Sequence, residues 1–546
     1  MSTTVSVRTV SGLVKARIMQ SISAFQERNG ATALRGDRHF FSILVASDVS
    51  PRGSRLNISV DSPIKDQVRL FTVEHVPVSM PAYLNTDDDY IGKDLGVYPD
   101  ILRPASAVYT MAGRIAQVYV QVDIPKDLAP GKYPVKVDFS LDESSDVAAT
   151  ATYTVEVLDA ELPEQTLTVT HWFHYDCLAL EYDVEVFSER HWRLIEDFLV
   201  GYVDHGNNAL LTPIFTPPLD TKVGGERLTV QLIDVTVKNG KYHFGFKKLR
   251  RFCAMCQRVG VKELEISHFF TQWGAAHAPK VIATVDGEKR RIFGWDTDAS
   301  GEEYICFLRT LLPKLKAELD KCGYRGHYFF HISDEPNELH VEQYSKAKAG
   351  IIDLIEDHPV RDAMSHIEYY EQGITGAPIP GTNRIKPFLE AKVSDLWTYY
   401  CCTQHRDVSN QFVAMPGYRT RVIGAQLYKF DIKGFLQWGY NFYFNRYSIE
   451  KTNPFVNLEG DLFTPAGDCF LVYPGRGGKP LHSLRELIFE QGLLDMRAMQ
   501  AAEKKVGRDA VIAVIDIEGE IDFATYPRHE DYLLNLRDTV NRIAAK

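Results

Sequence analysis

The chain has 546 residues, more than the ~100–200 of one typical domain, so two or three domains are expected. Its net charge is −11, and the charged residues are spread along the chain, which argues against nucleic acid and anionic membrane as partners. No stretch approaches the ~20 uninterrupted apolar residues that cross a bilayer, so we expect no membrane insertion.

The N-terminus, "MSTTVSVRTVSGLVKARIMQ", lacks a basic segment followed by an apolar run. We therefore expect no signal peptide and a cytoplasmic location, although a secreted chain trimmed of its signal would look the same. The 8 Cys are too sparse for a disulfide scaffold. Cys253 and Cys256 lie in a helical pattern with no second CxxC, and Cys401 and Cys402 lie in a strand-like run, so core packing is predicted for both pairs.

Residues 1–163 predict an antiparallel β-sandwich domain. Segments such as 54–61, 115–125 and 133–141 alternate apolar and polar residues, and Pro/Gly turns separate them. The two strands on either side of Pro130-Gly131 are expected to form a hairpin. Residues 9–29 have helical spacing and predict an amphipathic helix.

Residues 164–505 predict a (β/α)8 barrel of the TIM type. Short apolar runs alternate with helical segments, an order typical of a parallel sheet with helices outside. Seven strands are clear, and the sixth, near 378–392, is weak. A polar, hairpin-like insert follows the second strand. Residues 506–546 are expected to be a C-terminal extension that packs on the barrel or the sandwich. The expected helices span 188–206, 246–260, 302–323, 341–357 and 417–431.

The active site of such a barrel lies at the C-terminal ends of its strands. In this chain those ends carry aromatic, amide and carboxylate side chains without a cationic cluster, a lining that suits a neutral, hydroxyl-rich ligand such as a sugar. No Gly-rich dinucleotide fingerprint follows a strand and "PGRGGKP" lacks the Walker spacing, so no cofactor is predicted. The predicted substrate-binding residues are His174, Asp176, Asn208, Trp273, His331, Tyr399, Trp438, Asn441 and Tyr443.

The fourth strand ends on two adjacent carboxylates, Asp334 and Glu335, followed by Pro336. Alternation places Glu335 on the inward face with Phe329 and His331, and Asp334 on the outward face. Both can reach one ligand only if the strand breaks up at Asp334. Pro336 favours a loop there, because it biases its predecessor out of helical geometry and has no N–H.

Two other readings of this stretch stay open on local sequence. "DEPNE" could cap the following helix, with Asp334 or Asn337 as N-cap and Glu338 in the first turn. His331, Asp334 and Glu335 could also bind a metal. There is no HExxH motif and no second close His/Asp cluster, so no metal is predicted.

With these features in place, the chain resembles glycoside hydrolase family 123, whose characterised members are β-N-acetylgalactosaminidases. "ISDEP" after the fourth strand matches the family's catalytic Asp-Glu pair. The blocks "LLTPIFTPPLD", "SHFFTQWGAAHAP", "LWTYYCC", "RTRVIGAQLYKFDIKGFLQWGYNFY" and "GDCFLVYPG…HSLRELIFEQGLLD" also look like the family, over roughly residues 166 to 500. Two stretches depart from it: the region of the sixth strand is short, and "HWFHYDCLALEYD" after the first strand is distinctive.

The resemblance implies an exo-acting hydrolase that releases terminal β-linked N-acetylgalactosamine by a substrate-assisted retaining mechanism. Glu335 would be the general acid/base, and Asp334 would hold the N–H of the 2-acetamido group, whose oxygen attacks C1. An ionised Asp334 would also raise the pKa of Glu335. A β-N-acetylglucosaminidase and a non-catalytic carbohydrate-binding barrel remain as alternatives. The partner would be a glycan or glycoconjugate, and both a monomer and a homo-oligomer are compatible with the sequence.

Overall fold

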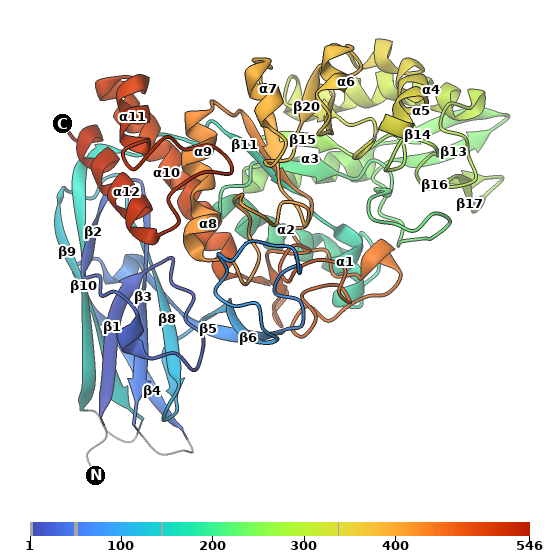
Figure 1. The fold of residues 1–546 in the computed structure, drawn as a ribbon. Coiled ribbons are helices and arrows are strands. Elements are labelled where there is room, and N and C mark those ends of the chain that lie inside the picture. Colours follow the sequence, from blue (N-terminus) through green and yellow to red (C-terminus); the bar gives the residue numbers. More distant parts are fainter. Residues whose placement is uncertain (1–3, 49–52, 143–145, 337) are drawn as a thin grey trace.

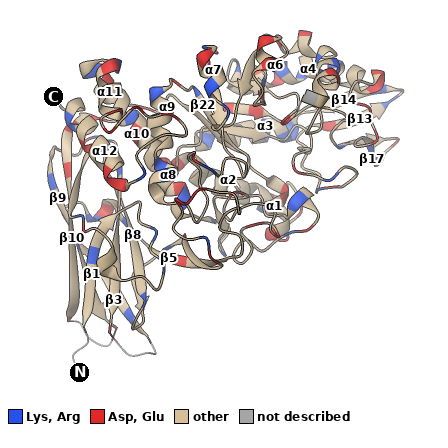
Figure 2. Cartoon of the chain, viewed as in Figure 1, with Lys and Arg blue, Asp and Glu red and all other residues tan. Residues whose placement is uncertain are grey.

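The structure, a computed structural model, describes residues 4–48, 53–142, 146–336 and 338–546. N-terminal strands form one side of the molecule, and a region of alternating strands and helices forms the other (Figure 1). Three C-terminal helices lie over the junction between the two. Lys and Arg are interspersed with Asp and Glu throughout the chain (Figure 2). No described helix is long and apolar enough to cross a membrane.

The N-terminal region consists of two five-stranded sheets that share one core, which confirms an N-terminal antiparallel β-rich region. Strand β10 buries alternate residues, including Tyr153, Val155 and Val157, as expected for a strand with one face on a core. All pairings in both sheets are antiparallel except β2–β10, which is parallel. The first sheet has the order β1 (Val5–Ser11), β3 (Arg38–Ser47), β8 (Ile115–Asp123), β5 (Val68–Val78), β6 (Gly96–Pro104). The second has the order β2 (Gly30–Arg35), β10 (Val147–Glu161), β9 (Gly131–Leu141), β4 (Ser54–Asp61), β7 (Ala107–Thr110).

Two local predictions for this region are wrong. The strands on either side of Pro130-Gly131, β8 and β9, do not form a hairpin, because the chain crosses there from one sheet to the other. Residues 9–29 are not an amphipathic helix: they include the end of β1 and only a short 3-10 turn, Ile22–Ala24. β1 pairs with β3 in a register that sets Val5 opposite Ser47, and this long-range pairing overrides the local spacing.

The second region contains eight parallel strands in three hydrogen-bonded sheets with the orders β11-β22-β21, β12-β15-β18 and β19-β20. Single parallel bridges at Phe330–Val360 and Gly381–Tyr399 connect neighbouring sheets. The Asn208 N–H also donates to the Val169 carbonyl at 3.0 Å, between β12 and β11. The strands are β11 (Thr168–His171), β12 (Ala209–Thr212), β15 (Glu263–Ile266), β18 (Tyr328–Phe330), β19 (Arg361–Ala363), β20 (Ala377–Ile379), β21 (Trp397–Tyr399) and β22 (Gly434–Gln437).

Helices connect these strands, as the alternating pattern predicts. In α2 the Ser188 hydroxyl accepts the His191 N–H as N-cap, and Trp192, Ile195 and Phe198 lie on the buried face. Cys253 and Cys256 are buried in α3, so the prediction of core packing is confirmed. The helices are α1 (Tyr175–Glu181), α2 (Glu189–Asp204), α3 (Lys247–Val259), α4 (Glu302–Leu319), α5 (Val341–Ala349), α6 (Glu368–Glu371), α7 (Lys386–Glu390), α8 (Gly417–Arg421) and α9 (Ile423–Lys429).

The polar insert is part of a separate four-stranded sheet with the order β14-β13-β16-β17. Its two hairpins turn at Asn239-Gly240 and Asp286-Gly287, where all four residues have positive φ. Only the first of these hairpins was predicted from the sequence. The strands are β13 (Asp234–Lys238), β14 (Lys241–Gly245), β16 (Val281–Val285) and β17 (Glu288–Phe293); a further pair is β23 (Tyr473–Pro474) and β24 (Pro480–Leu481).

The C-terminal helices join the two regions. Helix α10 (Leu484–Val506) is buried along most of its length, and Arg485 forms an ion pair with Asp100 of β6 in which both side chains are fully buried. Removing one partner of such a pair typically costs ~3–5 kcal/mol. Helices α11 (Arg508–Ile515) and α12 (Glu530–Ala544) follow. In α12, Asn541 Nδ2 donates to the Thr32 carbonyl of β2 at 3.1 Å, so the C-terminal segment contacts the N-terminal sheets.

Candidate active site

A cavity of about 180 Å³ opens at the C-terminal ends of the parallel strands. Segments that follow β11, β15, β18, β21 and β22 all contribute to it, together with the last residue of β19. It is lined by Trp172, Leu219, Asp220, Gln272, Trp273, Asp334, Glu335, Ala363, Tyr399, Cys401, Cys402, Thr403, Leu436, Trp438 and Phe463. Cys401 and Cys402 therefore border the cavity as well as an apolar cluster, whereas core packing alone was predicted.

Asp334 and Glu335 both line this cavity, because the strand ends before them. Strand β18 stops at Phe330, and Glu335 has a φ of 42°, in the left-handed region that non-glycine residues rarely adopt. Trp273 has a φ of 58°, and its N–H donates to the Asp334 carbonyl at 2.8 Å. Non-glycine residues with a left-handed backbone conformation persist where surrounding contacts hold them, and they cluster at functional sites.

The helix-capping alternative does not describe this segment. A 3-10 turn at Glu338–His340 separates the pair from α5, whose N-cap is His340 and has no side-chain capping bond. Asp334 lies well before this position. Asn337 lies outside the described residues. The carboxylates of Asp334 and Glu335 are therefore directed to the cavity rather than to a helix end.

Desolvation favours the protonated form of both carboxyls in this pair. Burial raises the pKa of Glu335, although the Tyr399 hydroxyl, which donates to Glu335 Oε1 at 2.6 Å, opposes the shift. Burial and then the charge of Glu335 raise the pKa of Asp334 well above its usual range. Two adjacent buried carboxyls do not both ionise readily, so the pair titrates as a unit.

His331 lies beneath the pair rather than in the cavity. Its Nε2 donates to Glu265 Oε1 at 2.6 Å, and its Nδ1 lies 3.5 Å from Asp362 Oδ1. Burial would lower the pKa of His331, but its bonds to Asp362 and Glu265 outweigh burial and raise it to about 10. The resulting imidazolium lowers the pKa of Asp334 and so partly offsets the effect of burial.

His331 therefore has two carboxylate partners other than the catalytic candidates, and this disfavours a metal held by His331, Asp334 and Glu335. Among the described residues, no group of His, Cys, Asp and Glu with metal-binding proximity includes Asp334 or Glu335. Asp362 also accepts the Ile332 N–H at 2.9 Å, which fixes the end of the fourth strand.

Tryptophan rings give the cavity its apolar wall. Trp273 is 39% exposed. Trp438 Nε1 donates to Asp468 Oδ2 at 3.0 Å, and Trp172 Nε1 donates to Glu265 Oε1 at 2.7 Å. Rings whose N–H groups are anchored in this way present a fixed flat surface to a ligand.

Three predicted binding residues form a buried support behind Trp438 and do not line the cavity. His174 Nε2 donates to the Trp438 carbonyl at 2.9 Å, its Nδ1 accepts from Arg227, and its backbone N–H donates to Asn441 Oδ1. Burial and then Arg227 lower the pKa of His174 to about 3, so the ring is neutral. Arg227 also holds Asp176 in a two-point ion pair at 2.6 and 2.7 Å. Arg227 was not predicted from the sequence, because it lies in a loop whose course no periodicity reveals.

Two further predicted binding residues lie elsewhere. Tyr443 is buried in an apolar cluster, and its hydroxyl donates to the Val472 carbonyl at 2.9 Å. Asn208 precedes β12, at the N-terminal end of that strand, where its side chain bonds the backbone of Leu167 and Val169. Its position before the strand, rather than after it, is the physical reason that it does not reach the cavity.

Asp220 in the cavity wall, and Asp468 behind it, were not identified from the sequence. Burial raises the pKa of Asp468 to about 7, and Asp220 adds to the shift. Burial also raises the pKa of Asp220 to about 7. The charge of Arg227 opposes this shift, and the charge of Glu335 adds to it. Asp220 lies in the quoted block "LLTPIFTPPLD" and Asp468 in "GDCFLVYPG", but both belong to long loops whose direction no periodicity reveals.

We expect Asp468→Asn to stabilise the protein at neutral and higher pH. The folded-state pKa of about 7 lies above the unfolded value of ~3.9, so the folded protein holds this proton more tightly and loses stability as pH rises from about 4 to 7. Asparagine removes that penalty and can still accept from Trp438. The melting temperature of the variant should exceed that of the wild type by on the order of a few °C at pH 8 and much less at pH 5. An equal difference at both values would contradict the assignment.

Comparison with known proteins points to one family. Residues 172–502 match the family model of the glycoside hydrolase 123 catalytic domain. A solved family 123 glycoside hydrolase from Clostridium perfringens, described in work on glycolipid glycan hydrolysis, superposes with a TM-score of 0.75 and 16% identity, over 99% of each chain. At that identity the likeness concerns the fold alone. A Ruminococcus gnavus β-glucuronidase in complex with uronic isofagomine gives a TM-score of 0.30 at 8% identity, over 84% of this chain and 67% of that one, too low to carry an argument. No curated protein matches.

Proposed function

Because the chain belongs to glycoside hydrolase family 123 and is a glycosidase, we propose that it releases a terminal β-linked N-acetylgalactosamine by a substrate-assisted retaining mechanism. One observation carries this proposal: two consecutive carboxyls, Asp334 and Glu335, line one cavity whose lining includes three tryptophan rings. Asp334, Glu335, Trp273, Tyr399 and Trp438 are the predicted site residues that support it.

The spacing of the pair favours this chemistry over double displacement by an enzyme nucleophile. A retaining glycosidase with a carboxylate nucleophile places its two carboxyls ~5–5.5 Å apart on opposite sides of the anomeric carbon. Adjacent residues start from Cα atoms ~3.8 Å apart and cannot readily occupy those two sides. If the acetamido oxygen of the sugar attacks C1, the protein needs only an acid for the leaving oxygen and an anion beside the amide N–H.

One proton shared between Asp334 and Glu335 suits these two roles. In the free enzyme the hydrogen bond from Tyr399 favours ionised Glu335, which leaves the proton on Asp334. A bound acetamido group would offer its N–H to Asp334 and favour the ionised form there, so that the proton resides on Glu335, where the leaving oxygen takes it. We propose that substrate selects this arrangement, with Glu335 as general acid/base and Asp334 as the residue that polarises the amide.

We further propose that the eight parallel strands form a closed (β/α)8 barrel. The two bridges between sheets and the contact between β11 and β12 support this closure. The domain limits that we propose are those expected from the sequence: a sandwich over 1–163, a catalytic barrel over 164–505 and a C-terminal extension over 506–546.

The sugar could instead be N-acetylglucosamine, which differs only in the orientation of O4. By analogy with the Clostridium perfringens enzyme, a glycolipid glycan is the proposed source of the terminal sugar. Paired 4-nitrophenyl β-glycosides test the proposal. We expect turnover of the N-acetylgalactosaminide to exceed that of the N-acetylglucosaminide, and no turnover of the galactoside. Comparable turnover of the galactoside would contradict the proposed role of the acetamido group.

Trp438→Ala should weaken substrate binding without unfolding the protein. Removing the indole takes away a flat apolar surface, so we expect KM to rise by about tenfold. Trp295→Ala is a matched control, because Trp295 is a half-buried tryptophan that does not line the cavity. An unchanged KM together with a collapsed melting temperature for Trp438→Ala would assign this ring to the core instead.

A further inference from the structure

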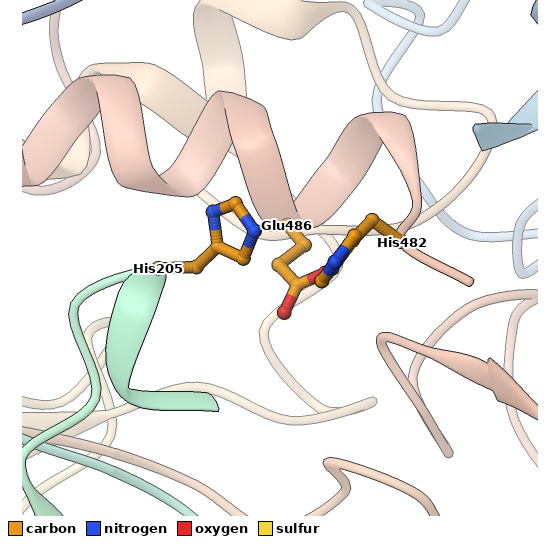
Figure 3. A group of neighbouring side chains, drawn as sticks. All are labelled: His205, His482 and Glu486. Carbon is orange, nitrogen blue, oxygen red and sulfur yellow. The ribbon is translucent and has the colours of Figure 1, made fainter. Parts of the chain in front are cut away.

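We propose that His205, His482 and Glu486 form a binding site for a divalent transition-metal ion of the zinc type. One ligand atom from each residue lies within 4.8 Å of the others. The three side chains converge from the end of α2 and from the start of α10 (Figure 3). None of them lines the active-site cavity, so the inference does not depend on the proposed function. Two imidazoles, one carboxylate and a water would complete a four-coordinate zinc site.

The ring of His205 is held in the orientation of a metal ligand. Its Nδ1 lies 2.7 Å from Glu490 Oε2, so Nδ1 donates to that carboxylate and the neutral ring would present the Nε2 lone pair to an ion. Figure 3 shows the other ring nitrogen turned toward Glu486. Metal-binding histidines usually donate their second N–H to a carboxylate in this way, which fixes the ring and raises its basicity.

Glu486 offers a buried carboxylate oxygen that needs a positive partner. Its side chain is 2% exposed, and Oε1 has no hydrogen-bond partner among the described residues. Oε2 lies 2.8 Å from His482 Nδ1. Leaving a charged group's oxygen unpaired in the interior is costly, and a bound cation would satisfy it.

The Tyr440 hydroxyl is the competing partner for this oxygen. It is buried without a hydrogen-bond partner in the described structure, and burial and then Glu486 raise its pKa well above the usual value. If Tyr440 simply donated to Glu486, no ion would be required. The two arrangements differ in one measurable property, the affinity for metal.

The site is accessible from solvent. The His482 side chain is 22% exposed, which gives an ion a path from solvent. A Cβ on Gly201 of α2 would lie 3.1 Å from His482 Cε1, so glycine lets this ring pack on the helix. The local charge is also favourable: Arg38, whose guanidinium lies 2.8 Å from Glu490, also pairs with Asp123 and Asp204, so its positive charge is already compensated.

The described residues contain one other group with comparable proximity, His268, His331 and Asp362. All three are fully buried, and Asp362 already accepts hydrogen bonds from the backbone of Ile332 and Ser333 and from Tyr344. The carboxylate of Asp362 is therefore committed to three donors and the group has no path from solvent, which favours the site at His205.

Zinc alone is the probe. The full-length protein, stripped with a chelator and dialysed, should bind one Zn²⁺ per chain in a calorimetric titration, and saturating Zn²⁺ should raise its melting temperature by on the order of 2 °C. His482→Asn and Glu486→Gln should weaken binding at least 100-fold. Glu490→Gln should weaken it ~10–100-fold, as loss of a carboxylate behind a ligand histidine does. His243→Asn, at an exposed histidine, is the matched control and should bind as the wild type does.

His482 is partly exposed, so His482→Asn keeps the test meaningful if Glu486→Gln does not fold. Wild-type protein that binds no Zn²⁺ at micromolar concentration would overturn the proposal and leave Tyr440 as the partner of Glu486. Unchanged affinity in a folded His482→Asn would overturn it as well, because the ion would then be bound elsewhere.

Discussion

Glu335→Gln is expected to lower kcat by ~10²–10⁴, the usual contribution of a general acid/base. Glutamine keeps the shape of the side chain and can still accept from Tyr399, but it cannot supply a proton to the leaving oxygen. The loss should be large for glycosides of poor leaving groups, such as alkyl glycosides. It should shrink for 4-nitrophenyl and more acidic leaving groups, which need little protonation. Steady-state kinetics over a series of leaving groups checks this expectation.

Glu342→Gln is a suitable control, since Glu342 is exposed on α5 and does not line the cavity. It should retain wild-type kcat on every substrate. A Glu335→Gln enzyme within a few-fold of wild type on an alkyl glycoside would remove Glu335 from the role of acid.

Asp334→Asn is expected to lower kcat much more than it raises KM. The variant keeps the shape and removes the charge that polarises the amide as the oxazolinium forms, so the interaction lost belongs to the transition state. The thiazoline analogue of that intermediate should inhibit the wild type and bind Asp334→Asn more weakly. Inhibition constants and kcat measured on the same preparations check both statements.

The two substitutions should differ in their dependence on the leaving group. The defect of Asp334→Asn should persist with acidic leaving groups, because amide polarisation is needed whatever group departs. The alkaline limb of its kcat profile should also move to lower pH, because in the substrate complex, where Asp334 is ionised in the wild type, loss of that charge lets Glu335 ionise more readily. Isolation of a covalent sugar ester on Asp334 from the wild type would contradict this role.

The local sequence patterns predict the strands and helices better than their partners in space. Strand β9 has a long alternating pattern, and α2 and α3 have capped or amphipathic ones, so all three appear where they were predicted. The prediction of a hairpin at Pro130-Gly131 was wrong, because the same turn residues suit a hairpin and a crossover between two sheets. Packing of the two sheets, which no short segment encodes, decides between them.

Residues that line the cavity could be predicted from the sequence where the position at the end of a strand is enough to fix the direction of the side chain. Asp334, Glu335, Trp273, Tyr399 and Trp438 follow or end parallel strands and line the cavity. His174, Asp176 and Asn441 also follow strands. Their hydrogen bonds to Arg227 and to the backbone direct their side chains away from the cavity, into the buried support behind Trp438. Asp220 and Asp468 come from long loops, whose course depends on packing. Strand position therefore indicates which residues are near the site but not which of them face it.

The nucleophile in the proposed mechanism is the amide oxygen of the substrate, and replacing hydrogens of its acetyl methyl by fluorine tests this claim most directly. Each fluorine withdraws electrons and weakens that oxygen as a nucleophile without changing the leaving group. For 4-nitrophenyl β-glycosides carrying acetyl, fluoroacetyl, difluoroacetyl and trifluoroacetyl groups, we predict that kcat/KM of the wild type falls steeply with each fluorine. A kcat/KM that stays constant along the series would show that the amide does not attack C1, and would contradict the roles proposed for Asp334 and Glu335.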